Sequence, residues 1–284
     1  MAIFSNQATL TYNGNTTNSN IAYGEILDVL AVTKTSVEGV YAPGQPVTYV
    51  VTLRNTGTAP LTALTVTDDL GGYDLNGFTL YPLTYEAGSA AVFVDGVPQP
   101  APAVTAGPPL TVTGLTVPAG GDLVLVYQAR ANEFADPTAT GTIVNTVTVT
   151  GDGLSAPGTA TATVTGTAAP RLTITKSISP AQVVDNDRVT YTFLIQNTGN
   201  EAVIATDNAA ITDTFDPILT DLAVTFNGAA WTEGVQYTYS EATGLFTTVP
   251  GQITVPAATY VQDPVTGAYT LTPGVVTLTI TGTI

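Results

Sequence analysis

Two long stretches of this chain repeat the same landmarks in the same order, so the chain must build one architecture twice. The first covers residues 30–70 ("LAVTKTSVEGVYAPGQPVTYVVTLRNTGTAPLTALTVTDDL") and the second covers residues 172–215 ("LTITKSISPAQVVDNDRVTYTFLIQNTGNEAVIATDNAAITDTF"). They share Thr-Lys, Val-Thr-Tyr, Asn-Thr-Gly and a late Thr-Asp. Each copy consists of short alternating segments with Asn-Thr-Gly turns between them, a pattern typical of a Greek-key β-sandwich.

The composition agrees with a β-sheet protein and excludes several functions. Hydrophobic residues make up 44% of the 284 residues, which is enough to build packed cores. The chain has no Cys and no His, so disulfides, zinc sites and triads that use these residues are excluded. The net charge of −16 argues against a basic nucleic-acid interface. We expect no cofactor and no bound metal.

Neither end of the chain shows a targeting feature. The first residues, "MAIFSNQATL", lack the charged and apolar regions of a signal peptide. No run of about 20 apolar residues could span a membrane, so we expect no membrane insertion. Export, if it occurs, leaves no mark in the sequence.

The repeat predicts an all-β fold of two tandem immunoglobulin-like Greek-key sandwiches. We expect domain 1 over residues 30–169 and domain 2 over residues 170–284, joined through "GTAAP". Domain 2 stops after "LTPGVVTLTITGTI", which matches the "GGDLVLVYQAR" strand of domain 1. It therefore lacks the closing hairpin that domain 1 has after that strand.

The missing hairpin is present at the other end of the chain, in residues 1–29. The segment "IFSNQATLTYNG" aligns without a gap with "TIVNTVTVTGDG" and places Asn6 against Asn145. Its apolar face consists of Phe4, Ala8, Leu10 and Tyr12, which alternate with polar neighbours. An isolated hairpin is marginally stable, and a sandwich without its last strands exposes its core. The two pieces complement each other, as in strand addition.

The hairpin has two places to insert. It could fold back into domain 2 of its own chain, or it could enter domain 2 of the next copy. The second arrangement recreates the normal connection of a continuous array, because the hairpin leads directly into domain 1. A head-to-tail contact that does not close generates an open filament. We therefore predict that the partners are copies of the chain itself.

Part of the pattern has a known counterpart. The order "KT…PGQPVTYVVTLRNTG…VTDDL…GTIVNTVTV" resembles the conserved repeat domain of bacterial and archaeal surface proteins called domain of unknown function eleven. Both halves carry the first part of this pattern. The resemblance implies an extracellular protein of the cell or spore surface, an immunoglobulin-like sandwich, and no enzymatic activity toward a substrate.

The only two lysines, Lys34 and Lys176, occupy the same place in each repeat. Strand alternation puts Lys34 on the face of Val32 and Lys176 on the face of Ile174, which points both toward the core.

The same test places Asp68 and Asp213 inward in mid-domain, and Asn145 inward late in domain 1. Domain 2 has no Asn after residue 227, and its equivalent is Asn6 on the displaced hairpin.

Buried Lys, Asp and Asn are the reactants of an isopeptide bond, and the arrangement resembles the self-crosslinking sandwich domains of Gram-positive pilins and adhesins. Burial lowers the pKa of a lysine and raises that of a carboxyl, which gives a neutral amine and a carboxyl that can shuttle protons. We predict Lys34–Asn145 within domain 1, assisted by Asp68. We predict Lys176–Asn6 between subunits, assisted by Asp213.

Plainer interpretations stay open. The lysines could form ordinary buried ion pairs or extend their amines to solvent. Asp69 next to Asp68 makes a one-residue register error possible, and Asn145 could bond backbone groups. A monomeric surface adhesin, with the hairpin folded back on its own domain 2, is the alternative function.

Overall fold

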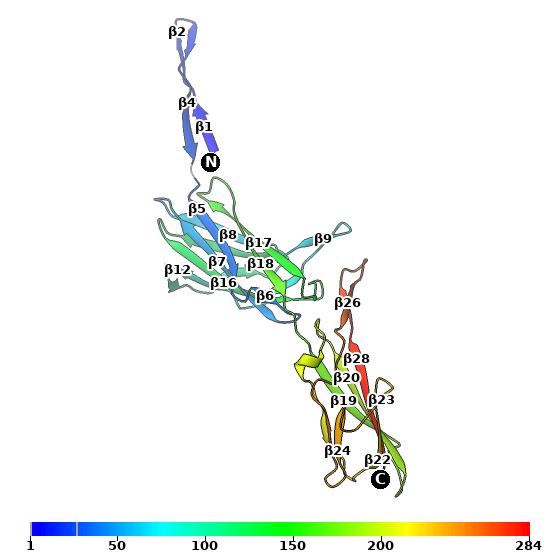
Figure 1. Ribbon diagram of the computed structural model, residues 1–284. Helices are drawn as coiled ribbons and strands as arrows, with labels where there is room; N and C mark the ends of the chain where they lie inside the picture. The colour runs from blue at the N-terminus through cyan, green and yellow to red at the C-terminus, as the bar shows by residue number, and fades with distance from the viewer. Residues whose placement is uncertain (1, 27) are drawn as a thin grey trace. The chain divides into compact units, whose positions relative to one another are not determined.

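Strands make up almost all of the regular structure in the computed structural model, which describes residues 2–26 and 28–284 (Figure 1). Within these residues, helical structure is confined to one short 3-10 turn, η1 (Ala205–Asp207). No helix among them is long and apolar enough to cross a membrane. The chain divides into two compact units, unit 1 (Met1–Asp136 and Gly141–Gly166) and unit 2 (Pro137–Thr140 and Thr167–Ile284).

Unit 1 contains a β-sandwich whose two sheets enclose one hydrophobic core. The first sheet has the order β13-β12-β16-β7-β5, with β11 also paired to β16, and the second has the order β14-β15-β8-β17-β18-β6. The strands of the first sheet are β5 (Leu30–Ser36), β7 (Pro46–Asn55), β11 (Leu83–Tyr85), β12 (Ala91–Val94), β13 (Val97–Pro98) and β16 (Asp122–Ala131). The strands of the second are β6 (Val40–Tyr41), β8 (Leu61–Asp68), β14 (Ala103–Thr105), β15 (Leu110–Val117), β17 (Thr142–Asp152) and β18 (Gly158–Gly166).

Strict alternation in the sequence produces this core. In β7 and β16, and in β17 as far as Val149, every second side chain is buried, because successive residues of a strand point to opposite faces of the sheet. A separate hairpin of β9 (Tyr73–Leu75) and β10 (Phe78–Leu80) also belongs to this unit.

Unit 2 repeats the first sheet of unit 1 and only part of the second. Its larger sheet has the order β19-β20-β28-β22-β23. These strands are β19 (Leu172–Ser179), β20 (Arg188–Asn197), β22 (Thr220–Phe226), β23 (Ala229–Trp231) and β28 (Gly274–Thr283). The smaller sheet has the order β21-β25-β24, with β21 (Thr212–Thr214), β24 (Tyr237–Ser240) and β25 (Leu245–Thr248). The strands β26 (Thr259–Gln262) and β27 (Tyr269–Thr272) form a hairpin.

Residues 2–26 form the N-terminal hairpin, at the blue end of the colour range in Figure 1. Here β1 (Ala2–Asn6) pairs with β4 (Ala22–Ile26), and β2 (Thr9–Tyr12) pairs with β3 (Asn15–Asn18). The strand is divided at Gln7 and Ala8, where the sequence alone predicts one continuous alternation.

Candidate functional site

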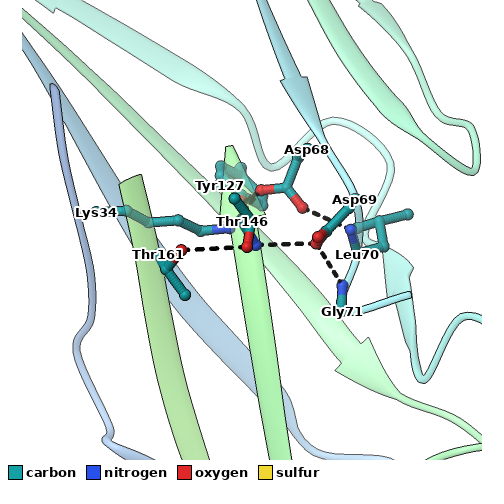
Figure 2. A network of polar contacts seen from close by, with 8 residues as sticks. All are labelled: Lys34, Asp68, Asp69, Leu70, Gly71, Tyr127, Thr146 and Thr161. Carbon is teal, nitrogen blue, oxygen red and sulfur yellow. Dashed lines mark hydrogen bonds and ion pairs between the residues drawn. The ribbon is translucent and has the colours of Figure 1, made fainter. Parts of the chain in front are cut away.

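The first candidate site lies in the core of unit 1, where Lys34 reaches from one sheet to the other. Lys34 is on β5 and Asp68 is at the end of β8. The Nζ atom donates to Oδ2 of Asp68 at 2.7 Å, and the two side chains are 0% and 1% exposed. The same Nζ lies 4.9 Å from the centroid of the Tyr49 ring. Figure 2 shows the lysine pointing at the carboxylate.

Asp68 and its neighbour Asp69 have different surroundings (Figure 2). Oδ1 of Asp68 accepts from the backbone N–H of Leu70 at 2.8 Å, and Oδ2 also accepts from the Tyr127 hydroxyl. Oδ1 of Asp69 instead accepts from the backbone N–H of Thr146 at 2.9 Å, which ties the end of β8 to β17. The acid that faces the core is therefore Asp68.

Asn145 lies on β17 in the same layer of the core. Val147, two residues further on and on the same face, is paired directly with Asp68. Asn145 is fully buried, yet neither Nδ2 nor Oδ1 makes a hydrogen bond within the described residues. A buried polar group without a partner costs about 1–3 kcal/mol. The structure thus brings Lys34, Asp68 and Asn145 into one dry core and leaves the amide unpaired.

The ionisable groups of this core respond to its low polarity. Burial lowers the pKa of Lys34, and the nearby Asp68 carboxylate opposes this decrease. Burial also raises the pKa of both Tyr49 and Tyr127, and the Asn145 amide opposes the increase in each case. The amide therefore lies beside the two tyrosine hydroxyls, although its geometry gives no hydrogen bond. A lysine amine with a lowered pKa is a better nucleophile at neutral pH.

The corresponding pair in unit 2 is Lys176 and Asp213, which also form an ion pair. The Lys176 Nζ lies 4.5 Å from the centroid of the Tyr191 ring and 5.2 Å from that of the buried Phe215 ring. It therefore points to the inner face of its sheet, as Lys34 does. In contrast to the pair in unit 1, these side chains are 38% and 19% exposed.

The exposure has a structural reason, because unit 2 has no strands over this part of its core. In unit 1, β8 pairs with β15 along one edge and with β17 along the other. The equivalent β21 pairs with β25 and with no other strand in the described part of the chain. The edge of β21 and the inner face of β19 are open, and the side chains of β19 are all exposed, including Leu172, Ile174 and Ile178.

The N-terminal hairpin carries the predicted donor residues on its surface. Phe4, Ala8, Leu10 and Tyr12 are exposed, and so is Asn6. The pairing of β1 with β4 sets Asn6 opposite Ala22.

The same relation holds in the closing hairpin of unit 1, where Asn145 lies opposite Ala162. The N-terminal hairpin therefore repeats the local pairing of β17 with β18 around the asparagine.

The sequence alone does not predict that two tyrosines, Tyr49 and Tyr127, belong to the surroundings of the unit 1 site. The sequence pattern gives Tyr49 and Tyr127 no role beyond that of core residues. Both alternate with apolar residues in "VTYVV" and "LVYQA", so only the inward direction of each ring can be inferred. The contact of the Tyr127 hydroxyl with Asp68 joins two sheets and is absent from any local pattern.

No group of three or more acidic side chains that could hold a metal occurs within residues 2–26 and 28–284. The reacting groups of the site are thus the Lys34 amine, the Asp68 carboxyl and the Asn145 amide. Such a set can join an amine to an amide carbon and release ammonia, with the carboxyl as the proton carrier.

Among solved structures, the chain is similar to pilin and adhesin sandwich domains. It matches BcpA, the major pilin subunit of Bacillus cereus, with 13% identity, a TM-score of 0.36, and coverage of 96% of this chain and 73% of that one. For the pilus backbone of Streptococcus pneumoniae the identity is 13%, the TM-score 0.32 and the coverage 86% and 55%. For the collagen-binding domain of a Staphylococcus aureus adhesin the identity is 11% and the TM-score 0.30, and the match covers 49% of this chain and 99% of that one.

At these identities the similarity concerns the β-sandwich fold alone. No protein-family model matches the chain, so its resemblance to domain of unknown function eleven stays a prediction. No curated protein matches the chain.

Proposed function

We propose that this chain is a structural subunit of an extracellular filament of the cell or spore surface, in which the N-terminal hairpin of one copy completes unit 2 of the next. The observation that carries this proposal is the open edge of β21 beside the uncovered inner face of β19. Unpaired strand edges and exposed core side chains favour association with another chain. Addition of a strand pair would bond the free backbone groups of β21 and cover the exposed side chains of β19.

Unit 1 supplies the register of the proposed insertion. There β17 runs antiparallel to β8 with Val147 opposite Asp68 and Val149 opposite Val66. In the gap-free alignment with the hairpin, Ala8 takes the place of Val147 and Leu10 that of Val149. Ala8 then lies opposite Asp213, and Asn6 enters the layer of Lys176.

The second strand of the hairpin has a role as well. In unit 1, the beginning of β18 packs on Leu30 and Val32 of β5. The returning strands of the hairpin, β3 and β4, would cover Leu172 and Ile174 of β19 in the same way. Full burial of each of these side chains contributes about 1.5–3 kcal/mol.

A second copy is favoured as the source of the hairpin. The chain passes from β18 to β19 through residues 167–171, and from β4 to β5 through residues 27–29. A hairpin seated in unit 2 of the next copy would therefore continue into its own unit 1 through a connection of only three residues, compared with five inside the chain. Repetition of this contact yields an open polymer.

The proposed cross-links make the polymer covalent. The Asp carboxylate takes a proton from the lysine ammonium, and the neutral Nζ attacks Cγ of the asparagine. As the new N–C bond forms and the bond from Cγ to Nδ2 breaks, the carboxyl gives its proton to the leaving nitrogen, which departs as ammonia. The regenerated carboxylate then takes the second proton that Nζ loses on becoming an amide nitrogen. The unpaired amide of Asn145 supports this role, because a buried asparagine kept for structure has partners. Lys34–Asn145 closes unit 1, and Lys176–Asn6 joins two copies.

The test is a denaturing gel of the boiled full-length protein with intact mass on each band. Wild type is compared with Asn6→Ala and with the matched control Asn15→Ala, which changes another exposed asparagine of the same hairpin. We expect a ladder in wild type and in the control, and a single monomer band for Asn6→Ala. Non-covalent filaments of Asn6→Ala should persist before boiling, as seen by negative-stain microscopy.

Other results would contradict parts of this proposal. A wild-type monomer that has lost two ammonia molecules would show that the hairpin folds back on its own chain. A monomer that has lost one ammonia would confine the chemistry to unit 1. A monomer of unchanged mass would exclude both cross-links, and an absence of filaments before boiling would exclude the polymer.

A further inference from the structure

Tyr127 holds the carboxyl group on which the proposed chemistry depends. This residue of β16 is fully buried, and its hydroxyl donates to Oδ2 of Asp68 (Figure 2). The same oxygen accepts from Lys34 Nζ, and the other oxygen accepts from the N–H of Leu70. Three donors from three segments of the chain therefore fix both the position and the rotation of one carboxylate.

The Tyr127 hydroxyl is also next to the amide that would react. The Asn145 side chain opposes the increase in the pKa of Tyr127 that burial causes. Because its pKa is raised, the phenol keeps its proton at neutral pH, so it acts as a donor and not as a base. The Tyr127 hydroxyl, a single neutral donor, thus lies beside Asp68, the proposed proton carrier, and beside Asn145, whose amide would react with Lys34.

Tyr49 provides an internal comparison. Its ring stacks on that of Tyr127 with the centroids 5.6 Å apart, and the two residues face each other across β7 and β16. Both are fully buried, but the Tyr49 hydroxyl has no hydrogen-bond partner in the part of the chain that the structure describes. The two phenols therefore differ in their contact with Asp68.

Unit 2 keeps one member of this pair and lacks the other. Tyr191 occupies the place of Tyr49 in the Val-Thr-Tyr motif. Its partner across β20 and β28 is Ile280, where unit 1 has Tyr127. The carboxyl of Asp213 thus has no phenol at the equivalent position.

We infer that Tyr127 is a positioning residue for the Lys34–Asn145 cross-link, which holds Asp68 between the amine and the amide. The joint between subunits works without such a residue and forms more slowly than the cross-link in unit 1. This inference rests on the proposed function, since it concerns the rate of the same reaction.

The experiment follows ammonia loss over time by intact mass in full-length protein made by cell-free synthesis. Tyr127→Phe removes only the hydroxyl, and Tyr49→Phe is the matched control. We expect the unit 1 cross-link to form roughly ten-fold more slowly in Tyr127→Phe and at the wild-type rate in the control, as one hydrogen bond predicts. Ile280→Tyr should accelerate the joint between subunits.

A purely structural role for Tyr127 has a different signature. Each phenylalanine variant is also made with Asn145→Ala, so that no cross-link forms and the thermal unfolding midpoints can be compared. Equal midpoints with unequal rates support the inference. Equal rates for the two phenylalanine variants overturn it, and so does a rate that falls only together with the midpoint. If wild type releases no ammonia, the cross-link of the proposed function is absent, and the inference is overturned with it.

Discussion

At the scale of single residues, the buried asparagines of unit 1 show two uses of one side chain. Asn55, of the Asn-Thr-Gly motif, donates to the carbonyls of Ala59 and Pro118 at 2.8 and 2.9 Å and accepts from the N–H of Gly57. Asn145 is equally buried and makes none of these contacts. The first asparagine holds loops together, whereas the second has no hydrogen-bond partner among the described residues, as the proposed cross-link requires.

The lowered pKa of Lys34 leads to a prediction about stability. In Asn145→Ala, which lacks the asparagine of the proposed unit 1 cross-link, the free energy of unfolding should rise with pH between the lowered pKa of Lys34 in the folded protein and its ordinary value of 10.5. Burial lowers the pKa of Lys34 from its ordinary 10.5, so the unfolded chain binds a proton that the folded chain has released. Below the lowered pKa this dependence disappears.

Urea unfolding at several pH values measures the effect, with Asn145→Ala/Lys34→Met as the control. Loss of the lysine should reduce the slope of the free energy of unfolding against pH by at most about 1.4 kcal/mol per pH unit. The buried tyrosines act in the opposite direction at higher pH, because their pKa values are raised, but they are present in both variants. Identical slopes would show that Lys34 keeps its ordinary pKa in the folded protein.

Alternation in the sequence predicts the directions of Lys34, Asp68 and Asn145, since each lies in a regular strand with apolar neighbours. It does not predict the role of Tyr127, because the hydroxyl finds its partner in another sheet. It also cannot show that the Asn145 amide lacks a partner. Such contacts depend on how two sheets pack, which no single strand records.

At the scale of elements, the contrast between β8 and β21 defines the proposed interface. Both carry an inward Asp, but β8 has a strand along each edge and β21 has one along a single edge. Comparison of the two repeats predicts which elements are absent from unit 2. The division of the N-terminal hairpin into β1 and β2 is not predicted, because it depends on the backbone at Gln7 and Ala8.

The two faces of the donor strand should respond differently to one charge. In the proposed insertion, Leu10 takes the place of Val149, which is fully buried, and Thr11 takes the place of the exposed Thr150. We expect Leu10→Asp to weaken assembly by more than about 30-fold, the equivalent of the roughly 2 kcal/mol of apolar burial that is lost. Thr11→Asp should assemble like wild type.

Sedimentation velocity over a concentration series, on chains that also carry Asn6→Ala, measures the reversible step alone. Equal weakening by the two aspartates would mean that charge, and not the buried face, controls assembly. Normal assembly of Leu10→Asp would rule out the proposed register.

At the scale of the whole molecule, like charges oppose the meeting of two copies. Each copy carries a net charge of −16, and the Debye length falls from about 30 Å at 0.01 M salt to about 8 Å at 0.15 M. We expect the rate of polymer growth to increase about ten-fold over this range. Light scattering with time measures this rate, and Leu10→Asp should grow more slowly than wild type at either salt concentration. A rate that falls with added salt would indicate a contact between opposite charges.

The placement of the lysines near the beginning of each repeat has a mechanical consequence. With both cross-links in place, tension enters a copy at Asn6 and follows the backbone to Lys34, crosses the isopeptide bond to Asn145, and continues along the backbone to Lys176 and the next copy. Residues 35–144 and 177–284 lie outside this path. A filament under tension would then carry the force through covalent bonds alone. Most of each sandwich would bear no load, so neither domain could unfold under force.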